Sequence, residues 1–130
     1  MKQRQVPTSR KRTFAVNSAS WQPYEGGSTL GMMGAQGGTI TWDEEYAGQL
    51  RLTLEQDESR SFHAITCGIE GWLLHSRFFG EASEAIAAFE EMRPALVELG
   101  ARLPAGGPRG SPEAPRLGGP LLAAFVARYS

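Results

Sequence analysis

The sequence predicts an α+β domain, in which a four-stranded antiparallel meander carries one long, proline-kinked helix on a face. Two observations lead to this fold class. Apolar and polar residues alternate through residues 38–80, between clusters of turn residues, which is typical of antiparallel strands with one buried face. From residue 81 to residue 100 the apolar spacing becomes that of a helix. Strands followed by a helix, rather than alternating with helices, indicate the α+β class.

The strand pattern is clearest in residues 49–56, where leucines alternate with polar or charged residues. Gly68 and Gly71 enclose two residues and predict a tight hairpin between the third and fourth strands. A two-residue loop and a three-residue loop both remain open here. The choice matters because a shift of one residue moves every side chain to the other face of the sheet. The four strands are expected within residues 38–43, 49–56, 61–68 and 71–79.

The helix is expected over residues 81–100, with apolar residues along one face and glutamates mostly elsewhere. Gly100 is typical of a helix end. Pro94 lies inside the helical pattern and has no backbone N–H to donate. We therefore expect a kink or a break near residues 91–94.

The chain of 130 residues allows one small domain with tails, and residues 21–102 account for it. Residues 1–20 begin with a polar, basic stretch that predicts a flexible arm. Residues 103–119 contain too much glycine and proline for a packed element, so they predict a linker. Residues 120–130 predict a short amphipathic helix.

Residues 26–38 form a glycine-rich loop before the first strand. Glycines allow backbone N–H groups to approach an anion, but the segment lacks the Gly-Lys-Ser/Thr ending of a phosphate-binding P-loop. We expect a tightly turning surface loop. Its apolar residues Leu30, Met32 and Met33 are expected to pack against the domain or against a partner.

One helix cannot cover both faces of this sheet, because both faces carry apolar residues. A three-residue hairpin loop would gather Phe62, Trp72, Leu74 and Phe78 on one face. The second face is expected to be covered by the N-terminal segment, by the C-terminal helix, or by a second copy of the chain. The candidates in the N-terminal segment are Phe14, Trp21 and Tyr24. A homodimer is the most economical cover, because a unit of this size is marginal alone.

The C-terminal helix is expected to dock, because an isolated helix this short is marginal in water. It can dock on its own domain, on its own dimer, or on a different protein partner. Its apolar face recurs at helical spacing and consists of Leu121, Leu122, Phe125 and Val126.

Composition excludes several classes of protein. A single cysteine cannot form a disulfide framework within the chain. No apolar run approaches the roughly 18 residues that a membrane-spanning helix needs, and a membrane is not expected as a partner. The absence of a signal-peptide or lipidation pattern, together with the lone cysteine, predicts a cytoplasmic location.

The charge is unevenly distributed along the chain. Residues 37–102 hold twelve acidic and five basic residues, so the domain does not attract nucleic acid by its own field. Nucleic-acid contact would have to come from the basic cluster Arg10, Lys11 and Arg12 in the arm. The alternative for this cluster is a solvated tail.

His63, Cys67 and His75 lie close in sequence, but their spacing argues against a shared metal ion. Residues four apart on a strand have Cα atoms about 13 Å apart, and no recognised metal-ligand motif is present. A nucleophilic Cys67 would need exposure and a nearby base, whereas its apolar neighbours predict burial. We assign no catalytic residue, metal ligand or cofactor, and an enzyme is not favoured.

A small-ligand pocket is predicted if the hairpin loop has two residues. Thr66, His75 and Arg77 then share one sheet face, where Arg77 could pair with an anionic ligand and the other two could orient it. The alternative is that Arg77 pairs with Glu55 or with a glutamate of the helix.

The first hypothesis for the function is a non-catalytic protein-binding or assembly module, homodimeric, whose tails contact a partner. The alternative is a small-ligand-binding protein or minor enzyme that uses the sheet face around His75 and Arg77. A third is nucleic-acid binding through the basic arm.

Overall fold

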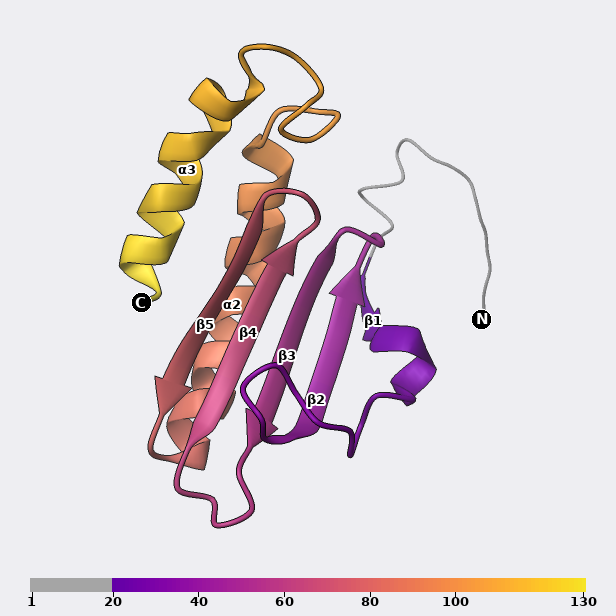
Figure 1. Ribbon diagram of the computed structural model, residues 1–130, viewed down its shortest axis with the longest axis vertical. Coiled ribbons are helices and arrows are strands. Elements are labelled where there is room, and N and C mark those ends of the chain that lie inside the picture. Colours follow the sequence, from indigo (N-terminus) through magenta and orange to yellow (C-terminus); the bar gives the residue numbers. More distant parts are fainter. Residues whose placement is uncertain (1–19) are drawn as a thin grey trace.

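The computed structural model describes residues 20–130 and confirms the α+β class (Figure 1). Residues 1–19 lie outside the described residues, and with them lie almost all of the expected basic arm and its cluster Arg10, Lys11 and Arg12. The elements in chain order are β1 (Trp21–Pro23), the 3-10 helix η2 (Tyr24–Gly27), β2 (Thr39–Tyr46), β3 (Leu50–Gln56), β4 (His63–Ile69), β5 (Leu73–Phe79), α2 (Ala82–Arg102) and α3 (Ala114–Arg128).

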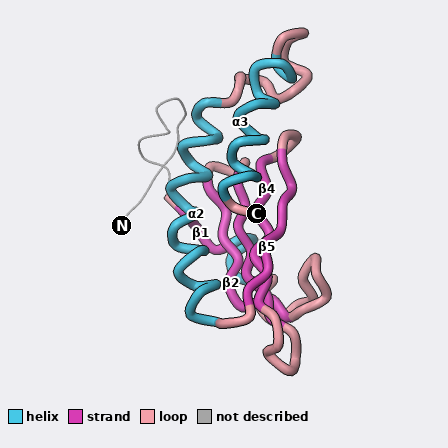
Figure 2. Tube along the Cα trace, turned by 90° about the vertical axis from the view of Figure 1, so that its left-hand side faces the viewer, coloured by secondary structure: helices cyan, strands magenta, loops and turns pink. Residues whose placement is uncertain are grey.

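The sheet is an antiparallel meander of five strands rather than four, in the order β1-β2-β3-β4-β5. The additional strand is β1, which pairs Trp21 with Tyr46 at the edge of the sheet. It has three residues and ends in Pro23, so it is too short to show an alternating pattern in the sequence. Helices α2 and α3 lie side by side on one face of the sheet (Figure 2).

The hairpin between β4 and β5 has a three-residue loop, because Ile69 pairs with Leu73. The turn is closed by a hydrogen bond from the backbone N–H of Trp72 to the carbonyl of Ile69, and Gly71 adopts a φ of 79° within it. In this register Cys67 lies opposite His75, and Thr66 lies opposite Ser76. The two-residue alternative is therefore not the one that the chain adopts.

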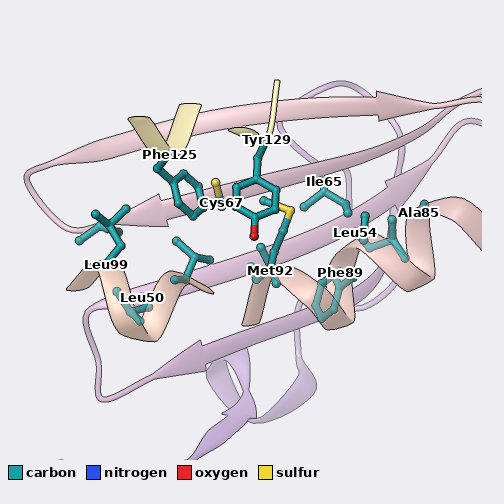
Figure 3. Close-up of a cluster of buried hydrophobic side chains, with 14 of the residues drawn as sticks. Leu50, Leu54, Ile65, Cys67, Ala85, Phe89, Met92, Leu99, Phe125 and Tyr129 are labelled. Carbon is teal, nitrogen blue, oxygen red and sulfur yellow. The ribbon is translucent and has the colours of Figure 1, made fainter. Parts of the chain in front are cut away.

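The core lies between the sheet and α2, as the leucine pattern of β3 predicts. Leu50, Leu52 and Leu54 are all buried and contribute to one apolar cluster with residues of β4 and α2. Phe89 of α2 is fully buried and stacks on Trp42, with ring centroids 3.9 Å apart. Figure 3 shows this cluster, which also includes Phe125 of α3 and Tyr129 directly after that helix.

Helix α2 runs through Pro94 without interruption, so the expected break does not occur. Pro94 lies on the exposed side of the helix, where water can satisfy the carbonyl that loses its donor. Buried residues on both sides of it, Met92 and Leu96, hold the helix against the sheet across this position.

Helix α3 begins at Ala114, six residues before the expected start at Pro120, so the linker is shorter than the sequence indicates. Close packing against the domain explains the difference. Gly118 lies directly on the ring of Trp72, and a Cβ at that position would come within 2.5 Å of the ring. Gly118, one of the glycines that predict a linker, therefore allows the helix to approach the turn between β4 and β5 closely.

Among residues 20–130, the structure contains no helix that is long and apolar enough to cross a membrane.

Candidate functional site

The sheet face opposite α2 and α3, which we call the open face, is the candidate site. Figure 1 shows the loop between η2 and β2 crossing the near side of the sheet, and Figure 2 shows it on the opposite side of the sheet from the helices. The strands β3, β4 and β5 contribute side chains to the open face that alternate with those of the core. These residues are Arg51, Thr53, Glu55, Ala64, Thr66, Gly68, Leu74, Ser76 and Phe78.

A buried carboxylate organises the open face near β2. Asp43 has no exposed side-chain surface, and it accepts two hydrogen bonds from Arg51, at 3.0 Å from Nε and 2.7 Å from Nη2. The hydroxyls of Thr29 and Thr53 also donate to it, at 2.8 and 2.9 Å. The hydrogen bond with Asp43 raises the pKa of Arg51 above its ordinary value. Arg51 also stacks over the ring of Tyr24, 3.7 Å from its centroid.

A second buried carboxylate, Glu55, holds the glycine-rich loop on the sheet. It is fully buried and accepts hydrogen bonds from the backbone N–H groups of Gln36, at 3.1 Å, and of Gly38, at 2.7 Å. A Cβ at Gly34 would come within 2.5 Å of this carboxylate, so the close approach requires glycine there. Backbone N–H groups of a glycine-rich loop can bind an anion. Here the anion that they bind is the carboxylate of Glu55, a residue of the same chain.

The loop is also tied to the far strand of the sheet. The side chain of Gln36 donates to the hydroxyl of Ser76, at 3.1 Å, and Ser76 shares a second hydrogen bond of 2.9 Å with the hydroxyl of Thr66. These bonds join the loop to β4 and β5. Hydrogen bonds therefore hold the loop in a fixed position on the open face.

Large apolar side chains lie exposed on this face. The exposed fractions are 79% for Leu74, 58% for Phe78 and 79% for Met33 of the loop. Leu30 and Met32 are also more than half exposed, so the apolar residues of the loop do not pack against the domain as one alternative expected. Single exposed apolar residues are common, whereas several on one face call for an explanation.

A cavity of about 320 Å³ lies between the loop and the sheet. Arg51 is the only charged residue among those that line it, and Asp43 balances that charge. The lining residues are Met33, Gly34, Ala35, Ile40, Arg51, Thr53, Thr66, Gly68 and Leu74.

The structure does not bring the three predicted ligand residues together. Thr66 lies on the open face, whereas the three-residue hairpin loop places His75 and Arg77 on the face that carries the helices. Nε2 of His75 lies 2.9 Å from the carbonyl oxygen of Tyr129, and Nη1 of Arg77 donates to the sulfur of Met92 at 3.6 Å.

The alternative for Arg77, an ion pair with Glu55 or a helix glutamate, is not found either. Glu55 lies on the opposite face, and no ion pair of Arg77 is present among residues 20–130. Its guanidinium instead lies over the rings of Phe79 and Tyr129, 4.9 and 5.4 Å from their centroids. The Nε of Arg77 and the hydroxyl of Tyr129 are buried and make no hydrogen bond with the described part of the chain.

The predicted partner-binding residues of the C-terminal helix face their own domain. Phe125 is buried in the core, Leu121 and Leu122 pack against it, and Val126 is half-buried. The helix therefore docks on its own domain, which was one of the three alternatives. It does not cover the second sheet face, because it lies beside α2.

The described residues contain no group of three or more His, Cys, Asp or Glu side chains that could hold a metal ion. His63 and Cys67 are both buried, at positions four residues apart on β4, and Cys67 faces His75 across the strand pair. Burial raises the pKa of the Cys67 thiol to about 11. The thiol is thus protonated at neutral pH, which opposes a nucleophilic role.

We expect the free energy of unfolding to fall as the pH rises from 9 to 11, by about 2 kcal/mol for Cys67 alone. The unfolded thiol ionises near pH 9.0, while the folded thiol stays protonated until about pH 11, so alkaline pH favours unfolding. Urea unfolding at several pH values measures this loss. The variant Cys67→Ala is the control, because it keeps the tyrosines that also ionise at alkaline pH but lacks the thiol. If its free energy of unfolding fell as much between pH 9 and pH 11 as that of the wild type, Cys67 would not be the cause.

Comparison of the chain with models of known families, with curated proteins and with solved structures finds no match.

The sequence does not predict that Asp43 and Glu55 are buried and organise the open face. Asp43 and Glu55 have the charges of ordinary surface residues, and no local pattern shows that the loop folds back onto them. Leu74 and Phe78 were grouped correctly by the three-residue alternative, but the sequence does not show which face the helices leave open.

Proposed function

We propose that this protein is a non-catalytic assembly module that forms a homodimer through its open face. The observation that carries the proposal is the exposure of Leu74 and Phe78 on one strand of that face, beside Met33 of the loop. Aromatic residues and methionine are enriched in protein interfaces, and charged residues are depleted at their centres. The open face around the cavity has this composition.

A second copy of the chain suits this surface better than a charged partner. The one charged residue that lines the cavity, Arg51, already pairs with Asp43, so two identical faces can meet there without like charges in contact. A two-fold dimer uses the same patch on both copies, which doubles the contribution of each apolar residue.

The structure changes the part that the C-terminal tail plays in this proposal. Phe125 belongs to the core of its own domain, so the helix contributes to the fold. The proposed contact is therefore the open face and no longer the tail. The ligand-binding alternative loses its pocket, because Thr66 lies on the opposite face from His75 and Arg77.

We expect Leu74→Glu and Phe78→Glu each to weaken the dimer by about 30-fold or more, because a charge at the centre of an apolar interface removes a dominant contact. Sedimentation equilibrium measures the dissociation constant, and circular dichroism shows that the fold is kept. Leu117→Glu is the matched control, because Leu117 is 52% exposed on α3, away from the open face.

The control variant should remain dimeric. A wild-type chain that is monomeric throughout the concentration range would overturn the proposal. So would a Leu117→Glu variant that dissociates as readily as Leu74→Glu, since the open face would then not be the interface.

A further inference from the structure

The register of the sheet leaves a hollow at Gly68 on the open face. Across the sheet, Gly68 of β4 lies between Arg51 of β3 and Leu74 of β5. Side chains of directly opposite residues stand side by side on one face of a sheet. Because Gly68 has no side chain, space remains between its two neighbours. The cavity of about 320 Å³ lies there, and all three residues line it.

The glycine-rich loop supplies the opposite wall of this cavity through Met33, Gly34 and Ala35. Hydrogen bonds from the loop backbone to Glu55 hold that wall in place, so the cavity is formed before a ligand binds. A preformed site requires less ordering on binding than one that its ligand must shape. The volume lies at the lower end of the range of about 300–1,000 Å³ that is typical of sites for small molecules.

The charges around the cavity favour an uncharged ligand. The guanidinium of Arg51 pairs with the carboxylate of Asp43, and the carboxylate of Glu55 lies against Gly34. These three groups together carry one negative charge, which disfavours an anion. Neither acid is among the residues that line the cavity, so a cation would meet no carboxylate in its wall.

The lining combines apolar surface with one available donor. Met33, Ile40 and Leu74 provide the apolar surface. Arg51 donates to Asp43 from Nε and Nη2, whereas its Nη1 makes no hydrogen bond with the described part of the chain. Nη1 can therefore donate to an acceptor atom, such as a carbonyl oxygen, on a molecule in the cavity.

We infer that this cavity binds a small, uncharged molecule that joins an apolar ring to a hydrogen-bond acceptor. The ring lies on Gly68, between Leu74 and the glycine-rich loop, and the acceptor faces Arg51. This site uses neither His75 nor Arg77. It lies within one copy of the chain, so it does not depend on the proposed dimer.

Benzamide is the probe for this site, because it has a phenyl ring and a carbonyl group and carries no charge. We expect the full chain to bind benzamide with a dissociation constant on the order of 1 mM, given the size of the molecule. Heteronuclear NMR titration measures this constant, and the backbone amides that shift should include those of Thr66, Gly68 and residues 33–35. Benzoate has nearly the same shape but a negative charge, and it should bind about fivefold more weakly.

Filling the hollow tests its place in the fold. Gly68→Val puts methyl groups where the ring would lie and should weaken benzamide binding about tenfold or more. A Cβ at Gly68 would meet only ordinary contacts, at 3.6 and 3.8 Å, so circular dichroism should show that the fold is kept. Gly80→Val is the matched control, because Gly80 lies after β5 and a Cβ there meets nothing within 4 Å. The control should bind benzamide as the wild type does. If Gly68→Val does not fold, Gly68→Ala should still weaken binding about threefold.

Amide shifts that lie outside the cavity would overturn the inference, as would equal affinities of the wild type and the folded Gly68 variant. Benzoate that binds as tightly as benzamide would overturn the class of ligand. The same titration with Phe78→Glu, whose substitution lies outside the cavity, separates the site from the proposed dimer. Benzamide binding to this variant, with a wild type that is monomeric, overturns the dimer alone. A wild-type dimer, with no benzamide bound by either protein, overturns the site alone.

Discussion

Replacing Asp43 with alanine is expected to lower the free energy of unfolding by about 3 kcal/mol. The carboxylate accepts four hydrogen bonds from three side chains and has no exposed surface. Its removal leaves the buried hydroxyls of Thr29 and Thr53 without acceptors, at a cost of about 1–3 kcal/mol for each orphaned group. Arg51 loses its partner too, but 40% of its side chain reaches solvent, which limits that part of the loss.

Thermal and urea denaturation measure this effect, and the melting temperature should fall by roughly 10 °C. Asp43→Asn keeps one acceptor oxygen and should lose less. Glu58→Ala is the control, because Glu58 is an exposed acid in the turn between β3 and β4. An Asp43→Ala variant as stable as Glu58→Ala would show that this network contributes nothing to folding.

Replacing Phe89 with alanine should cost about 4 kcal/mol, within the range of 3–5 kcal/mol for truncation of a buried phenylalanine. The ring is completely buried, and it stacks on Trp42 at 3.9 Å, so its removal leaves a cavity between α2 and the sheet. Urea unfolding followed by tryptophan fluorescence measures the loss, and the native emission should shift to longer wavelength as Trp42 gains contact with water.

Ile86→Ala provides the comparison on the same helix, since Ile86 is 43% exposed. Its loss should be less than about 1 kcal/mol. Similar losses for the two variants would mean that α2 does not hold its packed face against the sheet in solution.

The fold class could be predicted from the sequence because periodicity reports burial directly. The leucines of β3 alternate and all three are buried, and the helical spacing after residue 81 places Phe89 and Leu96 on the core side of α2. β1 could not be predicted in this way, since three residues show no period. The start of α3 was missed because glycine and proline density describes local preference, whereas the contact of Gly118 with Trp72 is tertiary.

The candidate site depended on information that local patterns do not carry. Thr66, His75 and Arg77 share a face in one hairpin register and separate in the other, so a single residue in a loop decided the prediction. The sequence allowed both registers. The buried positions of Asp43 and Glu55 depend on the folding of a loop that is distant in the sequence, and no spacing rule marks them.

Glu55 can also be regarded as a tethered ligand. The glycine-rich loop presents backbone N–H groups as anion sites do, and the chain delivers its own carboxylate to them. Tethering gives such a group an effective concentration in the millimolar range or above. The N–H groups of Gln36 and Gly38 are therefore already satisfied from within the chain, and the glycines of this loop serve the architecture of the open face.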